Sequence, residues 1–342
     1  MRRARGIVTL LGLSLALTLT ACSAGSNEAT EAATESAATA TVQPSEAAPS
    51  ASVPNETAGS QEPGSKGFLW RVSGGANPGY LVGTIHVARE EMYPLDPDLE
   101  QAVTEADYIG LELDLTKVDQ LALAALVTEK ALLTDGTTLK DHVSEEDYET
   151  FKAAMKKSLG IVGASAFDKY EPWYAAMTLE SLPAMKYQQT DGIDLHLAKQ
   201  AHDNGKTVIE LESAEGQLGI FDTFTEELQR LYFHQTVQGA ALASIGYKQL
   251  LDMWTLGDLK ILEQMHESYL KEGKKTMGDS FDEFDDAFLV ARNEGMVEKI
   301  DESLRGGDAG TYLFAVGSLH MVGEHGLVDE LERLGYELEY IE

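Results

Sequence analysis

Two short segments near opposite ends of the sequence share one pattern. Residues 81–86 read LVGTIH and residues 315–320 read AVGSLH, so each apolar run leads through glycine and a hydroxyl residue to histidine. Apolar runs of this kind are typical of buried strands, and Gly83 and Gly317 allow the backbone to turn or to approach a neighbour closely. Ligands of α/β sheets bind at the carboxyl ends of the strands. The pattern therefore predicts two strands, each with a histidine at the edge where ligands bind.

The two histidines, His86 and His320, are candidate metal ligands, because neutral imidazole commonly binds transition metals. Glu112 lies in the run GLEL and Glu212 in the run ELE, and a carboxylate in a buried strand needs a metal or a cation. Two alternatives stay open. The histidines can instead bond backbone carbonyls at strand ends, and an edge strand can leave one of Glu210 and Glu212 in water. A site of histidine and carboxylate suits Mn, Co, Fe or Zn.

The rest of the sequence alternates strand-like with helix-like segments. Strand-like segments cover residues 68–72, 80–86, 108–113, 207–212, 311–317 and 336–341. Helix-like segments cover residues 96–106, 116–132, 144–158, 173–179, 194–204, 224–272, 281–305 and 328–334. This alternation predicts the α/β class, with a central mixed β-sheet flanked by helices and a large helical insertion.

The first 22 residues indicate the compartment. Three arginines precede an apolar run at residues 10–20, a pattern typical of a secretory signal. The run continues into LTAC, which resembles the lipobox of bacterial lipoproteins, and this resemblance implies that Cys22 is lipidated after cleavage. A plain cleaved signal with a chance cysteine is the alternative. Cys22 is the only cysteine, which excludes an intramolecular disulfide and a cysteine-based zinc site.

Three regions follow from composition: a signal at residues 1–22, a tether at 23–66 and a folded part at 67–342. The tether is rich in Ala, Thr, Ser, Glu and Pro, and a segment with so few large apolar side chains is expected to be disordered. The whole chain carries 26 basic and 57 acidic residues, a net charge of −31. This charge argues against binding to nucleic acid or docking on anionic lipid, since both need a basic face. We therefore expect a protein held at the cell membrane by its lipid anchor, on the extracytoplasmic face.

The sequence resembles the TraB/GumN family, also called TraB/PrgY/GumN, which is related to the TIKI metalloproteases. The resemblance runs over most of residues 67–342. It rests on the segments FLWRV, YLVGTIHV, GLELDL, EPWYAAM, DGIDLHLAKQA, GKTVIELESAEGQ, ARN and FAVGSLHMVGEHGLVDELERLGYELE. The first and last of these are specific together, and the middle ones are looser. The resemblance implies a fold like that of TIKI proteins and erythromycin esterases, with a metal-dependent peptidase site formed by the two GxxH motifs.

By position, this resemblance implies that His86 and His320 bind the metal and that Glu112 and Glu212 serve as ligands or general bases. Arg292 also matches a family position. It could hold a carboxylate or a developing oxyanion, and a buried structural ion pair is the equal alternative.

Three further residues are weaker candidates. Asn293 falls on the apolar stripe of a helix, where a polar group needs a partner. Asp194 begins a helix, and we expect it to be the N-cap in preference to a catalytic group. Glu324 lies close in sequence to His320 and could assist it.

These features predict a metal-dependent hydrolase that cleaves a peptide or small amide outside the cytoplasmic membrane with divalent Mn, Co or Zn. The first alternative is a non-catalytic binding or regulatory lipoprotein that captures a peptide signal, a metal or haem. The second is a helical interaction scaffold on a tether.

Overall fold

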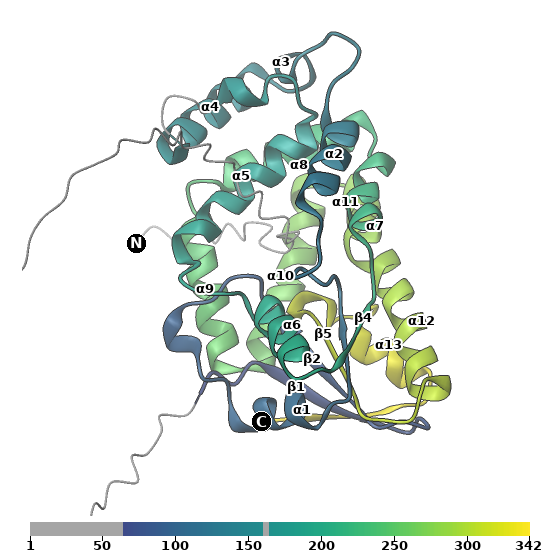
Figure 1. Ribbon diagram of the computed structural model, residues 1–342. Coiled ribbons are helices and arrows are strands. Elements are labelled where there is room, and N and C mark those ends of the chain that lie inside the picture. Colours follow the sequence, from purple (N-terminus) through teal and green to yellow (C-terminus); the bar gives the residue numbers. More distant parts are fainter. Residues whose placement is uncertain (1–63, 160–163) are drawn as a thin grey trace, which may run out of the picture. The chain divides into compact units, whose positions relative to one another are not determined.

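A computed structural model describes residues 64–159 and 164–342 (Figure 1). The predicted signal, the lipidation site Cys22 and residues 23–63 of the predicted tether lie outside the described residues. Within the described part of the chain, no helix is both long and apolar enough to cross a membrane.

Six strands form one mixed sheet, which confirms the predicted class. The strands are β1 (Phe68–Ser73), β2 (Gly79–Thr84), β3 (Tyr108–Leu111), β4 (Thr207–Glu210), β5 (Tyr312–Gly317) and β6 (Glu337–Ile341). Their order is β4-β3-β5-β2-β1-β6. The first four strands in this order are parallel, and β1 pairs antiparallel with both β2 and β6. The four parallel strands therefore end at one common edge.

The two strands that carry the repeated pattern are direct neighbours. β2 and β5 pair in parallel, with Gly83 opposite Val316 and Thr84 opposite Gly317. The two copies of the motif thus run side by side, offset by one residue. Space between them is small, since a Cβ added at Gly83 would lie 3.0 Å from the Ser318 hydroxyl. Glycine at this position permits the close approach of the two segments.

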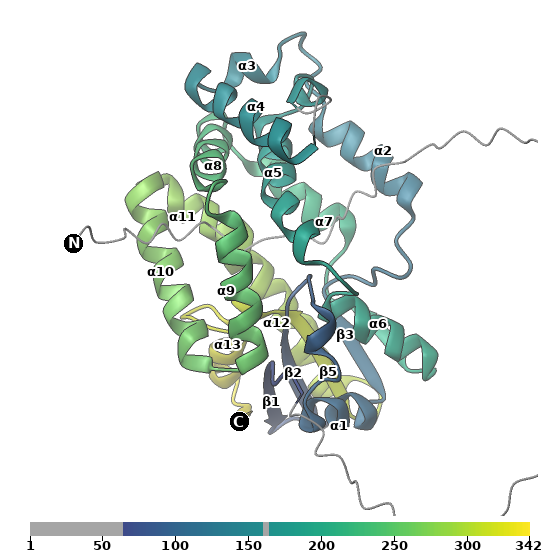
Figure 2. The same ribbon diagram turned by 90° about the vertical axis from the view of Figure 1, so that its left-hand side faces the viewer.

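Helices cover the sheet and form a large insertion (Figures 1 and 2). Those that contribute to the core around the sheet are α1 (Pro97–Glu105), α6 (Ile193–Asp203), α9 (Ala243–Leu256), α12 (Ala291–Gly306) and α13 (Leu327–Arg333). Those of the insertion are α2 (Gln120–Ala131), α3 (Leu139–His142), α4 (Glu145–Leu159), α5 (Pro172–Tyr187), α7 (Ala214–Gly219), α8 (Glu226–Gly239) and α11 (Ser280–Asp285). α10 (Leu259–Met277) contributes buried residues to both groups.

The buried side chains form two hydrophobic clusters. One surrounds the sheet, and the other lies among the insertion helices and is rich in aromatic rings. The segment that leads into α12 connects them, because Phe288 belongs to the insertion cluster whereas Met296 and Ile300 belong to the sheet cluster. Arg292 therefore lies between the two cores.

Three predicted strands end two residues earlier than expected. The predicted segment 80–86 ends as a strand at Thr84. The predicted segments 108–113 and 207–212 end as strands at Leu111 and Glu210, so that Glu112 and Glu212 follow β3 and β4 and do not lie within them. The two segments still run together for two more residues, with Glu212 N–H donating to the Glu112 carbonyl at 2.9 Å. The chain then turns into α7, whose N-cap is Ser213. Both carboxylates consequently stand at the carboxyl edge of the sheet.

The predicted helical region 224–272 is divided into three helices, α8, α9 and the first part of α10. Gly257 adopts a left-handed conformation at the end of α9, and Asp258 caps α10 through its side chain. Both are signals that end one helix and begin the next.

Candidate polar site

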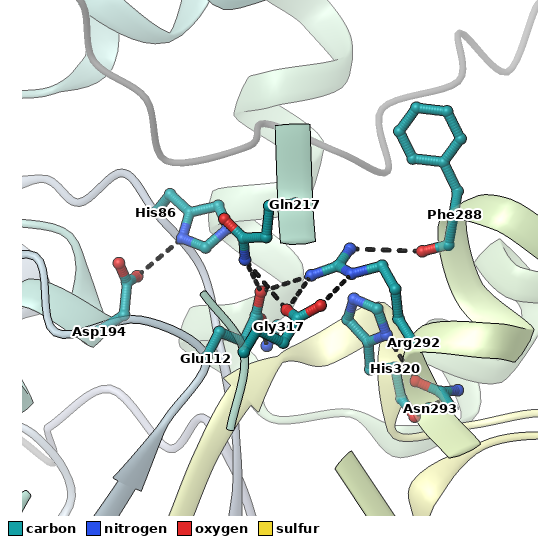
Figure 3. Close-up of polar contacts among 10 residues, drawn as sticks. His86, Glu112, Asp194, Gln217, Phe288, Arg292, Asn293, Gly317 and His320 are labelled. Atoms are coloured by element: carbon teal, nitrogen blue, oxygen red, sulfur yellow. Dashed lines mark hydrogen bonds and ion pairs between the residues drawn. The ribbon is translucent and has the colours of Figure 1, made fainter. Parts of the chain in front are cut away.

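The four predicted ligands all follow neighbouring parallel strands. His86 comes two residues after β2, Glu112 directly after β3, Glu212 two residues after β4, and His320 three residues after β5. Because parallel strands point their carboxyl ends the same way, the topology brings together residues that are far apart in sequence. Figure 3 shows the resulting cluster.

Arg292 holds both carboxylates of this cluster. Its Nη2 donates to Glu112 Oε2 at 2.8 Å and to Glu212 Oε2 at 2.5 Å, and its Nε donates to Glu212 Oε1 at 2.7 Å (Figure 3). The Arg292 side chain is 6% exposed and each glutamate side chain 12%. Contacts of this kind between a planar guanidinium and carboxylates are short and charge-assisted.

Two further donors complete the surroundings of the carboxylates. Gly317 N–H donates to Glu112 Oε1 at 2.6 Å. Gln217 Nε2, on α7, donates to Glu212 Oε2 at 3.0 Å and more weakly to Glu112 Oε2 at 3.4 Å. Each carboxylate is thus bonded to donors from several directions, which compensates for its partial removal from water.

The π-helical turn before α12 positions the arginine. Residues Asp286–Val290 form this turn, and Arg292 Nη1 donates to the Phe288 carbonyl at 3.3 Å. Isolated π turns occur frequently at functional sites, since they change the direction of the following side chains. Burial lowers the pKa of Arg292, but hydrogen bonds and charge from Glu212 and Glu112 raise it by more, so the group stays charged.

His86 is paired with Asp194. Its Nδ1 lies 3.0 Å from Asp194 Oδ1, and its side chain is 24% exposed. The contact depends on close docking of α6, because Ile193 N–H donates to the Ile85 carbonyl at 2.9 Å. Only glycine fits at the start of this helix, since a Cβ at Gly192 would lie 2.3 Å from the His86 carbonyl oxygen.

The N-cap of α6 is Gly192, so the expectation that Asp194 caps this helix was wrong. Asp194 instead lies in the first turn and turns its carboxylate to the imidazole. Its place in the cluster follows from tertiary docking of the helix, which the local sequence does not reveal.

His320 is held by Asn293. Its Nδ1 lies 2.6 Å from Asn293 Oδ1, and Asn293 Nδ2 donates to the His325 carbonyl at 2.7 Å. The second bond turns the amide so that its oxygen faces the imidazole. An amide oxygen only accepts, so Nδ1 of His320 carries the proton and Nε2 keeps its lone pair.

The two imidazoles have opposite electrostatic environments. Burial lowers the pKa of His86, but Asp194 and Glu112 raise it by more, to about 9. The pKa of His320 falls well below its ordinary value because of burial and the positive charges of Arg292 and His86, against the charge of Glu212. These mutual effects show that the four predicted ligands and Arg292 lie within electrostatic range of one another.

The chemistry of this set suits a divalent metal in part. Both imidazoles turn Nδ1 to an oxygen-bearing side chain, which is the orientation common among metal-binding histidines. The carboxylates, however, are bonded to Arg292. Across residues 64–159 and 164–342, no three His, Cys, Asp or Glu side chains are arranged to hold a metal ion. The predicted four-residue ligand set stays a prediction.

Sequence reasoning missed Gln217, which belongs to the polar cluster. It also included Glu324, which makes no polar contact with that cluster. Gln217 follows the N-cap Ser213 by four residues, so that one helical turn places it over Glu212. That cap was the signal that could have identified it. Glu324 is exposed, and within the described residues its side chain has no hydrogen bond or ion pair.

Comparison with known proteins agrees with the resemblance in the motifs. The sequence model of the family described as TraB/PrgY/gumN matches residues 68–340. A protein of Nematostella vectensis named metalloprotease TIKI homolog is 23% identical over 318 residues, which cover 80% of this chain and 67% of that protein. Human metalloprotease TIKI1 is 24% identical, over 80% of this chain and 61% of its own length.

A bacterial protein is also similar. The uncharacterized protein YbaP of Escherichia coli K12 is 28% identical over 255 residues, which cover 72% of this chain and 85% of that protein. The chain therefore spans most of YbaP, but only about three fifths to two thirds of the metalloprotease relatives. No solved structure matches the chain.

Proposed function

The chain belongs to the TraB/PrgY/gumN family, and from this membership and its polar cluster we propose that it is a metal-dependent hydrolase that cleaves peptides. One observation carries the proposal. Two imidazoles and two carboxylates stand at the carboxyl ends of four neighbouring parallel strands, where α/β proteins bind ligands. The similarity to proteins named metalloproteases supports the same reaction class.

His86 and His320 would hold the metal, together with one of the carboxylates Glu112 and Glu212. A divalent ion such as Mn, Co or Zn supplies Lewis acidity and lowers the pKa of water. The other roles belong to the chain itself. Asp194 and Asn293 orient the two imidazoles through Nδ1.

Arg292 can stabilise negative charge, both on the two glutamates and on a reacting substrate. It lies against Glu112 and Glu212 with Gln217 beside them, so these donors fix the direction of both carboxylates. A carboxylate that leaves the guanidinium group can accept a proton from water, and the guanidinium group is then available to a developing oxyanion.

We also propose the location and the substrate class. The acidic composition, the predicted signal and the predicted anchor at Cys22 support a lipoprotein on the extracytoplasmic face of the cell membrane. A peptide or a small amide is the substrate class that a peptidase-like site would take there.

One observation favours a second function. Both carboxylates are bonded to Arg292, so neither is a free general base in this arrangement. That is compatible with a regulatory lipoprotein that captures a peptide signal, a metal or haem without turnover.

The test uses the full-length chain in detergent, stripped of metal and then supplied with Mn, Co or Zn. Metal content and cleavage of a peptide library are measured for the parent, His86→Ala and His320→Ala, with His234→Ala on α8 as a control outside the cluster. We expect about one metal per chain in the parent, and loss of metal and cleavage in the first two variants only. Metal binding without cleavage would favour the second function, and absence of both would refute the hydrolase.

A further inference from the structure

A groove of about 670 Å³ opens beside the Glu212–Arg292 pair, and both residues line it. One wall is α7 with the 3-10 turn Ile220–Thr223 that follows it. The other wall is the segment from α11 through the π-helical turn to the first turns of α12. The groove begins at Leu211, directly after β4, which is an edge strand of the sheet.

Glycines on both walls keep this groove open. Gly219 lies on the α7 wall and Gly295 inside α12, and a Cβ added at either would meet no atom within 4 Å. Apart from proline, glycine is the least favourable residue in a helix interior. Packing does not account for Gly295, since it is exposed and space is free around it. Any longer side chain at Gly295 would instead extend into the groove.

The floor is apolar and the rim is acidic. Leu211 and Met296 are buried beneath the groove. Glu283, Asp286 and Glu298 stand on its rim, and within the described residues none of these carboxylates has an ion-pair partner. Apart from Arg292, the one basic side chain that lines the groove is Lys299, which donates to the Glu210 carbonyl at 3.1 Å.

We propose that this groove binds a peptide and selects one with a lysine or arginine side chain. The cationic side chain lies among the carboxylates of Glu283, Asp286 and Glu298, and the peptide backbone runs toward Glu212 and Arg292. The acidic rim attracts the cationic side chain, and the apolar floor takes the neighbouring side chains. This proposal rests on the proposed hydrolase function and specifies its substrate class.

The test measures binding apart from turnover. Four fluorescein-labelled decapeptides of alanine and serine differ only in one central residue: Lys, Arg, Gln or Glu. Fluorescence anisotropy with the full-length chain is recorded in the presence of a chelator, which prevents metal-dependent cleavage. We expect the Lys and Arg peptides to bind about tenfold more tightly than the Glu peptide, and this preference to shrink as salt is raised.

Two variants and a matched control distinguish peptide binding in the groove from general effects of charge or folding. Gly295→Leu fills the groove and should weaken binding of the Lys peptide about tenfold or more, whereas Gly306→Leu on the same helix should not change it. Gly306 is the matched control, because a Cβ there also meets no atom within 4 Å and the residue does not line the groove. The double variant Asp286→Lys/Glu298→Lys should reverse the preference toward the Glu peptide.

The outcomes also distinguish this proposal from the hydrolase. The groove proposal is overturned if the four peptides bind with equal affinity or do not bind. It is also overturned if Gly295→Leu binds the Lys peptide as tightly as the parent does. Peptides that bind with the expected preference but remain uncut after metal is restored would leave the groove standing and refute the hydrolase. Cleavage that does not depend on peptide charge and is unchanged by Gly295→Leu would refute the groove proposal and leave the hydrolase proposal standing.

Discussion

Glu180 should make the protein less stable as the pH rises from acidic to neutral. The residue lies on α5 inside the insertion core and is 7% exposed. Its carboxyl group accepts a hydrogen bond from the Tyr232 hydroxyl at 2.9 Å. Burial raises the pKa of Glu180 from 4.5 to about 8, against the lowering effect of that hydrogen bond. The folded state therefore binds a proton that the unfolded state releases above pH 4.5.

The sign and size follow from this difference in pKa. Below pH 4.5 the group is protonated in both states and costs nothing. Between pH 4.5 and 8 the folded state holds more protons, so the free energy of unfolding falls by about 1.4 kcal/mol per pH unit. The loss amounts to about 3 kcal/mol at pH 7 and approaches about 5 kcal/mol above pH 8.

Glu180→Gln removes the titration and keeps an oxygen to accept from Tyr232. Urea unfolding followed by circular dichroism, from pH 4 to pH 9, gives the free energy of unfolding of both proteins. The advantage of the variant should grow with pH by about 3 kcal/mol between pH 4 and pH 7. Thr150→Ser, at an exposed position on α4 and without a titratable group, should give a difference that does not vary with pH. A constant difference for Glu180→Gln as well would refute the reasoning.

Three other substitutions have outcomes that unfolding in urea can check. Arg292→Met leaves two buried carboxylates without their cation and should destabilise the fold by about 3–5 kcal/mol. Trp254→Phe removes the indole N–H that donates to the buried Gly83 carbonyl at 2.7 Å, and should cost about 1–3 kcal/mol. Gly110→Ala places a Cβ 2.4 Å from Cδ1 of Phe314 and should cost about 1–3 kcal/mol through overpacking. Parent-like stability in any of these would contradict the contact named for it.

The sequence located the residues of the polar cluster better than their partners. The repeated motif identified both histidines and their place at strand ends, because apolar runs that lead to Gly-x-x-His are visible locally. Glu112 and Glu212 were also found, since carboxylates in apolar runs need a partner. The identity of that partner depends on which strands are neighbours. Arg292 faces both carboxylates only because β3 and β4 are adjacent and α12 passes over their ends.

The order of the strands in the sheet could not be predicted from the sequence either. Hydrophobic patterns located all six strands to within a few residues, but nothing in them says that β5 lies between β3 and β2. The same limit applies to Asp194, which local sequence marks as a helix cap and tertiary docking turns to His86. Patterns within a segment report its own burial, whereas pairing between distant segments is decided by the packing of the whole domain.

The central place of β5 has a consequence for the order of events during synthesis. The ribosome makes β1 to β4 first, and at that stage the hairpin of β1 and β2 has no strand to connect it with β3 and β4. His86, Glu112 and Glu212 have then all been made, but the strand that lies between β2 and β3 is absent, so His86 is not aligned with the two carboxylates. Only when residues 312–320 emerge does one segment join the two halves of the sheet and deliver His320. A growing chain therefore lacks the assembled polar cluster until its last tenth is made.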